Sequence, residues 1–275
     1  MRTLSLLVAI ILAGGVTQTR AADILPIFDV HLHYSHDAWD PVPPERAIAI
    51  LRQAGLRRAM ISSSDDEGTQ KLFALAPDLV IPVLRPYRKR SDVSTWVRDE
   101  TVLAYLAERL ARHRYVAIGE FHVYGADADL PVMRGVVQMA KERGLFLHLH
   151  GDADAVERVF KQDPNARILW AHSGFDRPDN VHSMLDRHPR LWCDLAFRTD
   201  HASAGKIDPV WRSLFEAHPG RFMVGTDTFT PERWHYIVEH AIWSRAWLNE
   251  LPREMAERIA YRNAEELFGD AARSN

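Results

Sequence analysis

Two histidines separated by a single residue close the short apolar segment FDVHLH, which spans residues 28–33. Residues i and i+2 of a β-strand point to the same face, so His31 and His33 would project together if this segment is a strand. Neutral imidazoles bind divalent transition-metal ions, and two on one face can hold the same ion. Hydrogen-bonded core histidines are the alternative interpretation, and the metal hypothesis therefore depends on partners elsewhere in the chain.

Further metal-binding side chains stand at the ends of other apolar runs. The segment YVAIGEFHV contributes Glu120, LFLHLHG contributes His150, RILWAHSG contributes His172 and RFMVGTDTF contributes Asp227. Together with His31 and His33 they make four imidazoles and two carboxylates, more than one tetrahedral ion requires. Two ions bridged by a carboxylate and a hydroxide account better for this set. As alternatives, Glu120 could pair with an arginine, and Asp227 could cap a helix that begins nearby.

These side chains must be positioned by the elements on which they lie. Strand-like apolar runs and helix-like amphipathic segments alternate eight times after the first twenty-odd residues. Near-continuous apolar strands followed by helices indicate a parallel sheet buried on both faces. The pattern predicts an α/β protein whose single domain is a (β/α)8 TIM barrel, in which active sites form at the carboxyl ends of the strands. An open doubly wound sheet is the alternative, but no GxGxxG motif follows the first run to support its dinucleotide-binding form.

Residues 1–21 have the composition of a secretory signal peptide. A positive start at Arg2 precedes an uncharged apolar run over residues 4–16, and small residues flank the expected cleavage point after Ala21. The apolar run is too short to span a bilayer comfortably, although a retained N-terminal anchor is the alternative. We therefore expect a mature domain over residues 22–275, periplasmic or secreted, with no stable membrane insertion after cleavage.

The overall composition limits the classes of partner. The net charge of −3 gives no indication of nucleic acid as a ligand, and a small-molecule substrate is the expected partner. The single cysteine, Cys193, excludes an internal disulfide bond. The sequence does not indicate an oligomeric state.

The strand-end residues resemble those of the amidohydrolase superfamily, and specifically its amidohydrolase-related branch (amidohydrolase family 2) of metal-dependent TIM-barrel hydrolases. The resemblance extends from FDVHLH to RNAEELFG, whose residues 263–268 are similar to the usual ending of the family. It implies that His31, His33, His150, His172 and Asp227 bind metal. Glu120 resembles the strand-four glutamate of TatD-type hydrolases, which implies a bridging carboxylate. His148 shares a face with His150 and is expected to make a supporting hydrogen bond, with the reverse assignment as the alternative.

This resemblance implies a metal-dependent hydrolase that uses a metal-bound hydroxide. The expected cofactor is a pair of divalent ions, zinc first, with manganese, iron or cobalt as alternatives. Asp227 would be the catalytic residue that accepts and returns the proton. The scissile bond is left open among amide, ester or lactone, and phosphoester.

Three residues near the strand ends are candidate substrate contacts. Arg85 and Arg198 follow strand-like runs, and arginine binds carboxylate or phosphate groups through two parallel hydrogen bonds, which favours an anionic substrate. His122 shares a face with Glu120 and is the third candidate. Solvated loops are the alternative reading of both arginines.

Two other functions remain open. One is a non-oxidative decarboxylase with a single zinc ion on a similar set of ligands, which metal stoichiometry and carbon dioxide release would distinguish. The other is a non-catalytic periplasmic metal-binding protein, against which Asp227 argues because a carrier needs no dedicated proton acceptor.

Overall fold

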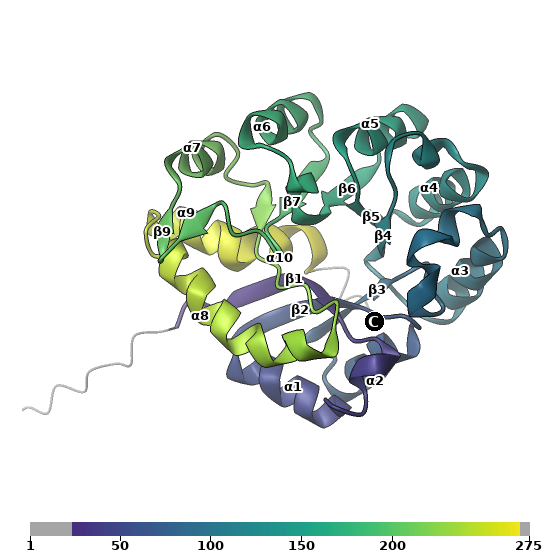
Figure 1. Cartoon of the computed structure of the whole chain (residues 1–275), viewed down its shortest axis with the longest axis horizontal. Helices are drawn as coiled ribbons and strands as arrows, with labels where there is room; N and C mark the ends of the chain where they lie inside the picture. Colours follow the sequence, from purple (N-terminus) through teal and green to yellow (C-terminus); the bar gives the residue numbers. More distant parts are fainter. Residues whose placement is uncertain (1–23, 270–275) are drawn as a thin grey trace, which may run out of the picture.

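Eight parallel strands follow one another in chain order around a barrel, with helices outside them (Figure 1). The computed structural model describes residues 24–269, and the predicted signal peptide lies outside this range. The strands are β1 Ile27–His33, β2 Leu56–Ser62, β3 Val80–Leu84, β4 Ala117–His122, β5 Phe146–His150, β6 Arg167–Trp170, β7 Leu191–Asp194 and β10 Phe222–Met223. The chain after β10 returns to β1, where Val30 N donates to Val224 O over 3.0 Å. The predicted single-domain (β/α)8 barrel is confirmed.

The helices alternate with the strands and form the outer ring. They are α1 Pro44–Gln53, α2 Glu67–Leu75, α3 Thr101–Arg112, α4 Pro131–Arg143, α5 Ala153–Gln162, α6 Pro178–Arg187, α7 Pro209–Ala217, α8 Ile237–Leu248, α9 Arg253–Glu257 and α10 Asn263–Phe268. Proline begins α1, α4, α6 and α7, where its missing N–H costs nothing. Asp152 and Asp208 cap α5 and α7 by accepting hydrogen bonds from backbone N–H groups in the first turn.

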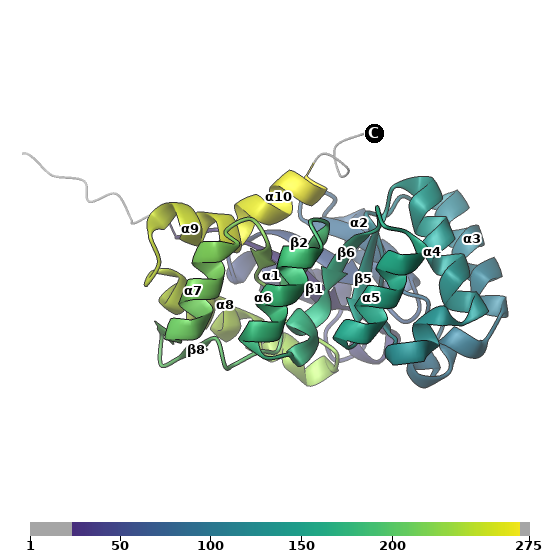
Figure 2. The ribbon, with the colours of Figure 1, turned by 90° about the horizontal axis from the view of Figure 1, so that it is seen from above.

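The C-terminal helix closes the end of the barrel from which the strands start. Phe268 of α10 packs its ring 6.4 Å from that of Phe28 and 4.6 Å from that of Phe146, measured between centroids. Figure 2 shows α10 lying across this end of the molecule. Because apolar side chains fill this end, only the opposite end, where the strands finish, is available for a polar site.

β1 contains a register shift at the point where its apolar residues give way to the two histidines. The pairing of β1 with β2 slips between Asp29 and Leu32, and such irregularities re-aim the side chains that follow. Phe28 precedes this shift and Val30 lies within it, and both belong to the apolar interior. His31 also lies within the shifted stretch and His33 follows it, and both face the mouth of the barrel.

Some elements differ from the expectation. The amphipathic segment after β3 becomes helical only at Thr101, because Asp99 accepts hydrogen bonds from the Thr101 backbone N and Oγ1 and favours a helix start there. A small hairpin of β8 Ala202–Ser203 and β9 Lys206–Ile207 was not anticipated. Within residues 24–269, no helix combines the length and the apolar character needed to cross a membrane.

Candidate metal centre

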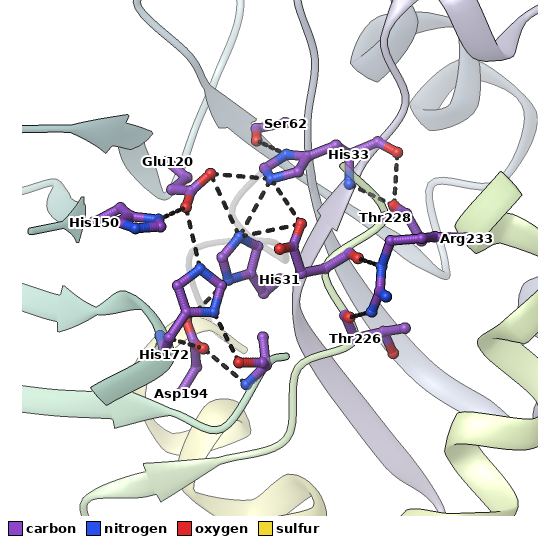
Figure 3. Close-up of polar contacts among 12 residues, drawn as sticks. His31, His33, Ser62, Glu120, His150, His172, Asp194, Thr226, Thr228 and Arg233 are labelled. Carbon is purple, nitrogen blue, oxygen red and sulfur yellow. Dashed lines mark hydrogen bonds and ion pairs between the residues drawn. The ribbon is translucent and has the colours of Figure 1, made fainter. Parts of the chain in front are cut away.

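The six predicted ligands meet at the carboxyl ends of the strands. Figure 3 shows how the candidates of β1, β4, β5 and the segment after β6 lie around Glu120. β1 carries the first two, β4 and β5 carry one each, and the last two lie just after β6 and β10; in chain order they are His31, His33, Glu120, His150, His172 and Asp227. All except His150 are buried.

The two histidines of β1 turn their Nε2 atoms toward one another, 3.2 Å apart. The other ring nitrogen of His31, Nδ1, lies 3.1 Å from Oδ2 of Asp194. A carboxylate accepts only, so this contact places the proton on Nδ1 and leaves a lone pair on Nε2. Burial lowers the pKa of His31, but Asp194 and Glu120 outweigh it and hold that pKa well above its usual value. Without a metal ion these negative surroundings favour a second proton on Nε2, and the same surroundings would favour a metal ion bound at that atom.

Asp227 turns an unsatisfied oxygen toward the same point. Its Oδ1 is buried without a hydrogen-bond partner in the described part of the chain, 3.5 Å from His33 Nε2 and 4.0 Å from His31 Nε2. Its backbone is left-handed, with φ of 58°, and its N–H donates to His31 O over 2.7 Å. Burial raises the pKa of Asp227, His31 opposes this rise and Glu120 adds to it. A buried orphan carboxylate oxygen beside two imidazole nitrogens fits a bound cation.

Glu120 places one oxygen on each side of the site. Oε2 lies 3.1 Å from His33 Nε2 and 2.9 Å from Arg85 Nη2. Oε1 lies 2.7 Å from His150 Nδ1 and 3.5 Å from His172 Nε2. Burial raises the pKa of Glu120, but the charge of His31 and hydrogen bonds from neighbouring histidines bring it well below its usual value, so the carboxylate is ionised.

The backbone before Glu120 requires glycine. Gly119 has a φ of 141°, and a Cβ at this position would lie 2.3 Å from the backbone oxygen of His148. The close approach of β4 to β5 brings Glu120 within reach of His150. A larger residue at position 119 would push the two strands apart.

The donors form two groups of three. One comprises His31, His33 and Asp227, the other Glu120, His150 and His172, and in each group the ligand atoms lie within 4.8 Å of one another. Three nitrogen and oxygen donors with an open fourth position are the usual ligands of a catalytic transition-metal ion. The residues present therefore fit divalent metal.

Two buried residues stand behind the ligands. His148, expected to support His150, has its Nε2 2.9 Å from Oδ2 of Asp194, the same oxygen that contacts His31. Asp194 also accepts from the backbone N–H of His172 over 2.9 Å. Sequence reasoning missed Asp194, although it ends the apolar run LWCD at a strand end, where the candidate ligands also lie.

The predicted substrate contacts fall in different places. Arg85 and His122 line a cavity of about 310 Å3 together with Glu120 and Asp227. Within residues 24–269, the lining of this cavity does not include Arg198. Its guanidinium donates to the carbonyl oxygens of His172, Ser173 and Asp176 and pairs with Asp200, so it secures the loop that carries His172.

Comparisons with known proteins agree with this architecture. The model of the family described as Amidohydrolase matches residues 28–269. No curated protein matches the chain.

Solved structures share the fold at low identity. An uncharacterised TIM-barrel protein from Bordetella bronchiseptica is 14% identical with a TM-score of 0.59, covering 90% of this chain and 99% of its own. A Pseudomonas putida protein proposed to be a 2-pyrone-4,6-dicarboxylic acid hydrolase is 16% identical with a TM-score of 0.59, covering 89% and 98%. A β-aspartyl dipeptidase from Fervidobacterium islandicum is 12% identical with a TM-score of 0.57, covering 88% and 72%.

The family match spans nearly all of the described chain, and the donor set at the strand ends fits the metal on which that family depends. The chain thus belongs to the amidohydrolase family and is a metal-dependent hydrolase of the amidohydrolase superfamily.

Proposed function

We propose that this enzyme holds two divalent ions, zinc first among them, on either side of Glu120 and hydrolyses an ester, lactone, amide or phosphoester bond in a small anionic molecule. The observation that carries the proposal is the orientation of Glu120, whose two oxygens face separate sets of imidazoles. A carboxylate so placed suits a bridge between two ions. The TatD-like role of Glu120 belongs to the same proposal.

The side chains of the site have separate roles in hydrolysis. Divalent ions held by these donors would polarise the scissile group and lower the pKa of a bound water toward neutrality. Asp227 lines the cavity, and its Oδ1 faces His31 and His33, where it would hold an ion. Its carboxylate accepts the proton of the attacking water and returns it to the leaving group. Asp194 fixes the tautomer of His31 and so keeps its Nε2 free to act as a ligand.

The cavity wall next to Glu120 supports an anionic substrate. Arg85 and Arg90 both line it, and His122 lies beside them. Arg85 is held by Glu120, to whose backbone oxygen its Nε donates over 3.1 Å. The guanidinium is therefore fixed in one orientation, which lowers the entropic cost of binding a carboxylate or phosphate.

The test is hydrolysis by the metal-loaded protein of a panel of lactones, esters, N-acyl amino acids and phosphoesters, each compared with and without a carboxylate. We expect the protein to hydrolyse one of these compound classes. Within that class, the compounds that carry a carboxylate should be hydrolysed faster. Full metal content without any hydrolysis would overturn the proposal, and carbon dioxide release from an acid by a protein with one ion would favour the decarboxylase instead. Export by the segment 1–21 belongs to the same proposal, and detection of a chain beginning at residue 22 in the periplasmic fraction tests it.

A further inference from the structure

Three phenylalanines surround one side of the cavity mouth. Phe175, Phe197 and Phe229 line the cavity, yet 50%, 46% and 45% of their surfaces are exposed. They follow β6, β7 and β10, which are neighbours in the barrel. Successive rings meet edge to face, with centroids 6.3 Å apart for Phe175 and Phe197 and 5.6 Å apart for Phe197 and Phe229. We call these three residues the phenylalanine rim.

The rim is held in a conformation that stability alone would not favour. Phe175 and Phe197 have φ of 49° and 57°, a left-handed backbone that bulky side chains avoid. Such strain is unfavourable and tends to occur at functional sites. Exposing large apolar rings to water adds a further cost. The presence of strained, exposed phenylalanines at the mouth of a cavity indicates that they bind a ligand.

Named contacts fix the position of each ring. Phe175 stacks on the ligand His172, with centroids 4.5 Å apart and planes 13° apart. The guanidinium of Arg233 lies 4.5 Å from the ring centroid of Phe197 and 5.4 Å from that of Phe229. Arg233 also donates to the backbone oxygens of Thr226 and Asp227, so the rim is connected to the segment that carries Asp227.

The remainder of the cavity wall is polar. Arg85, Tyr87 and Arg90 follow β3 and His122 ends β4, on the other side of the barrel from β6, β7 and β10 by strand order. The cavity thus has an arginine wall, in which Arg85 pairs with Glu120 and Arg90 pairs with Asp37, and an aromatic wall. Its volume of about 310 Å3 is at the small end of ligand pockets, which favours a single ring.

We propose that the phenylalanine rim binds a flat aromatic ring of the substrate, while the anionic group of the substrate faces the arginine wall. The occupant is the substrate itself, because the rim is continuous with the cavity over Glu120 and Asp227. The substrate class is then a single-ring aromatic acid derivative whose hydrolysable bond lies between the ring and the polar wall. This inference rests on the proposed hydrolase function and names its substrate.

The experiment measures binding and does not require turnover. Benzoate, cyclohexanecarboxylate and acetate are titrated calorimetrically into the metal-loaded protein; the first two share charge and approximate size and differ in aromaticity. Edge-to-face ring contacts predict that benzoate binds about three- to tenfold more tightly than cyclohexanecarboxylate. In the double variant Phe197→Leu/Phe229→Leu the preference for benzoate should become weaker, because only Phe175 of the rim remains, with acetate unchanged. Phe175 is left in place because it stacks on His172.

The matched control is Tyr236→Leu, which removes an aromatic ring that is 56% exposed and does not line the cavity over Glu120. It should keep the benzoate preference. Equal affinities for benzoate and cyclohexanecarboxylate in the wild type, or no binding of benzoate, would overturn the rim inference even if the panel is hydrolysed. A benzoate preference that becomes weaker in the double variant but not in Tyr236→Leu, without hydrolysis of any panel member, would support the rim and reject the hydrolase proposal.

Discussion

Oδ2 of Asp194 lies 3.1 Å from Nδ1 of His31, and this contact decides which nitrogen of the histidine remains for a metal ion. Asp194→Asn keeps the shape of the side chain but removes its charge and one acceptor. Since changing a residue that orients a metal ligand typically costs 10- to 100-fold in affinity, we expect a weakening of about that size, measured by competition with a chelator. The exposed Asp179→Asn is the control, and an unchanged affinity in Asp194→Asn would contradict the orienting role.

Asp227 is assigned the proton transfer, and its isosteric amide separates this role from metal binding. Asp227→Asn should retain the fold and most of the metal because the remaining donors are intact. Turnover should fall by about 10²- to 10⁴-fold, the usual contribution of a general base. The measurements are kcat, metal content and the circular dichroism spectrum. A near-normal kcat on the best substrate of the panel would reject the assignment.

Arg233 supports Asp227 from outside the cavity. Its Nη2 donates over 2.8 Å to Thr226 O, and its Nε donates to Asp227 O. Lysine cannot reproduce this planar pair of donors, so Arg233→Lys should lower kcat about ten- to hundredfold through misplacement of Asp227. It should also weaken the preference for benzoate, with metal content unchanged. The control is Arg212→Lys, because Arg212 donates to Glu250 O on the surface. Equal losses of kcat in the two variants would show that Arg233 does not position Asp227.

His201 predicts a specific loss of stability in acid. It is buried among Trp211, Trp243 and Trp247, and neither ring nitrogen has a hydrogen-bond partner in the described residues. Burial lowers the pKa of His201 to about 3; Asp200 opposes this, whereas Arg198 and His240 reinforce it. Between about pH 6.5 and about pH 3, His201 is protonated in the unfolded chain but neutral in the folded chain. Acidification therefore lowers the free energy of unfolding.

The measurement is urea denaturation of wild type and His201→Phe between pH 7 and pH 4. The free energy of unfolding of the variant should fall less steeply, by up to about 1.4 kcal/mol per pH unit. The comparison of slopes holds even if the variant is less stable at neutral pH. Parallel curves for the two proteins would show that His201 is not held neutral by the fold.

The positions of most candidate ligands could be predicted because a parallel barrel brings every strand end to one rim. His31, Glu120 and Asp227 are far apart in the chain, yet each ends or follows an apolar run. The same rule applies to Asp194, which ends β7 next to Cys193 but is not among the predicted site residues. The pattern of strand-like runs therefore predicts which residues meet at the candidate metal centre.

The loops are where sequence reasoning fell short. Arg198 follows a strand end, but its guanidinium turns to backbone carbonyls of the neighbouring loop. The phenylalanine rim depends on left-handed φ angles at Phe175 and Phe197, which no propensity would assign to phenylalanine. These conformations are imposed by tertiary contacts and so are absent from local sequence patterns.

The most direct test is the metal content of the chain from residue 22 onward, purified without a chelator or histidine tag and saturated with zinc. The measurement uses a His182→Ala background, because His182, Asp186 and His218 form a surface group with metal-binding spacing. The account predicts close to two ions per chain, falling to about one or fewer in Glu120→Gln because the bridging carboxylate is lost. A chain that binds one ion or none, or a Glu120→Gln variant that retains both, would contradict it.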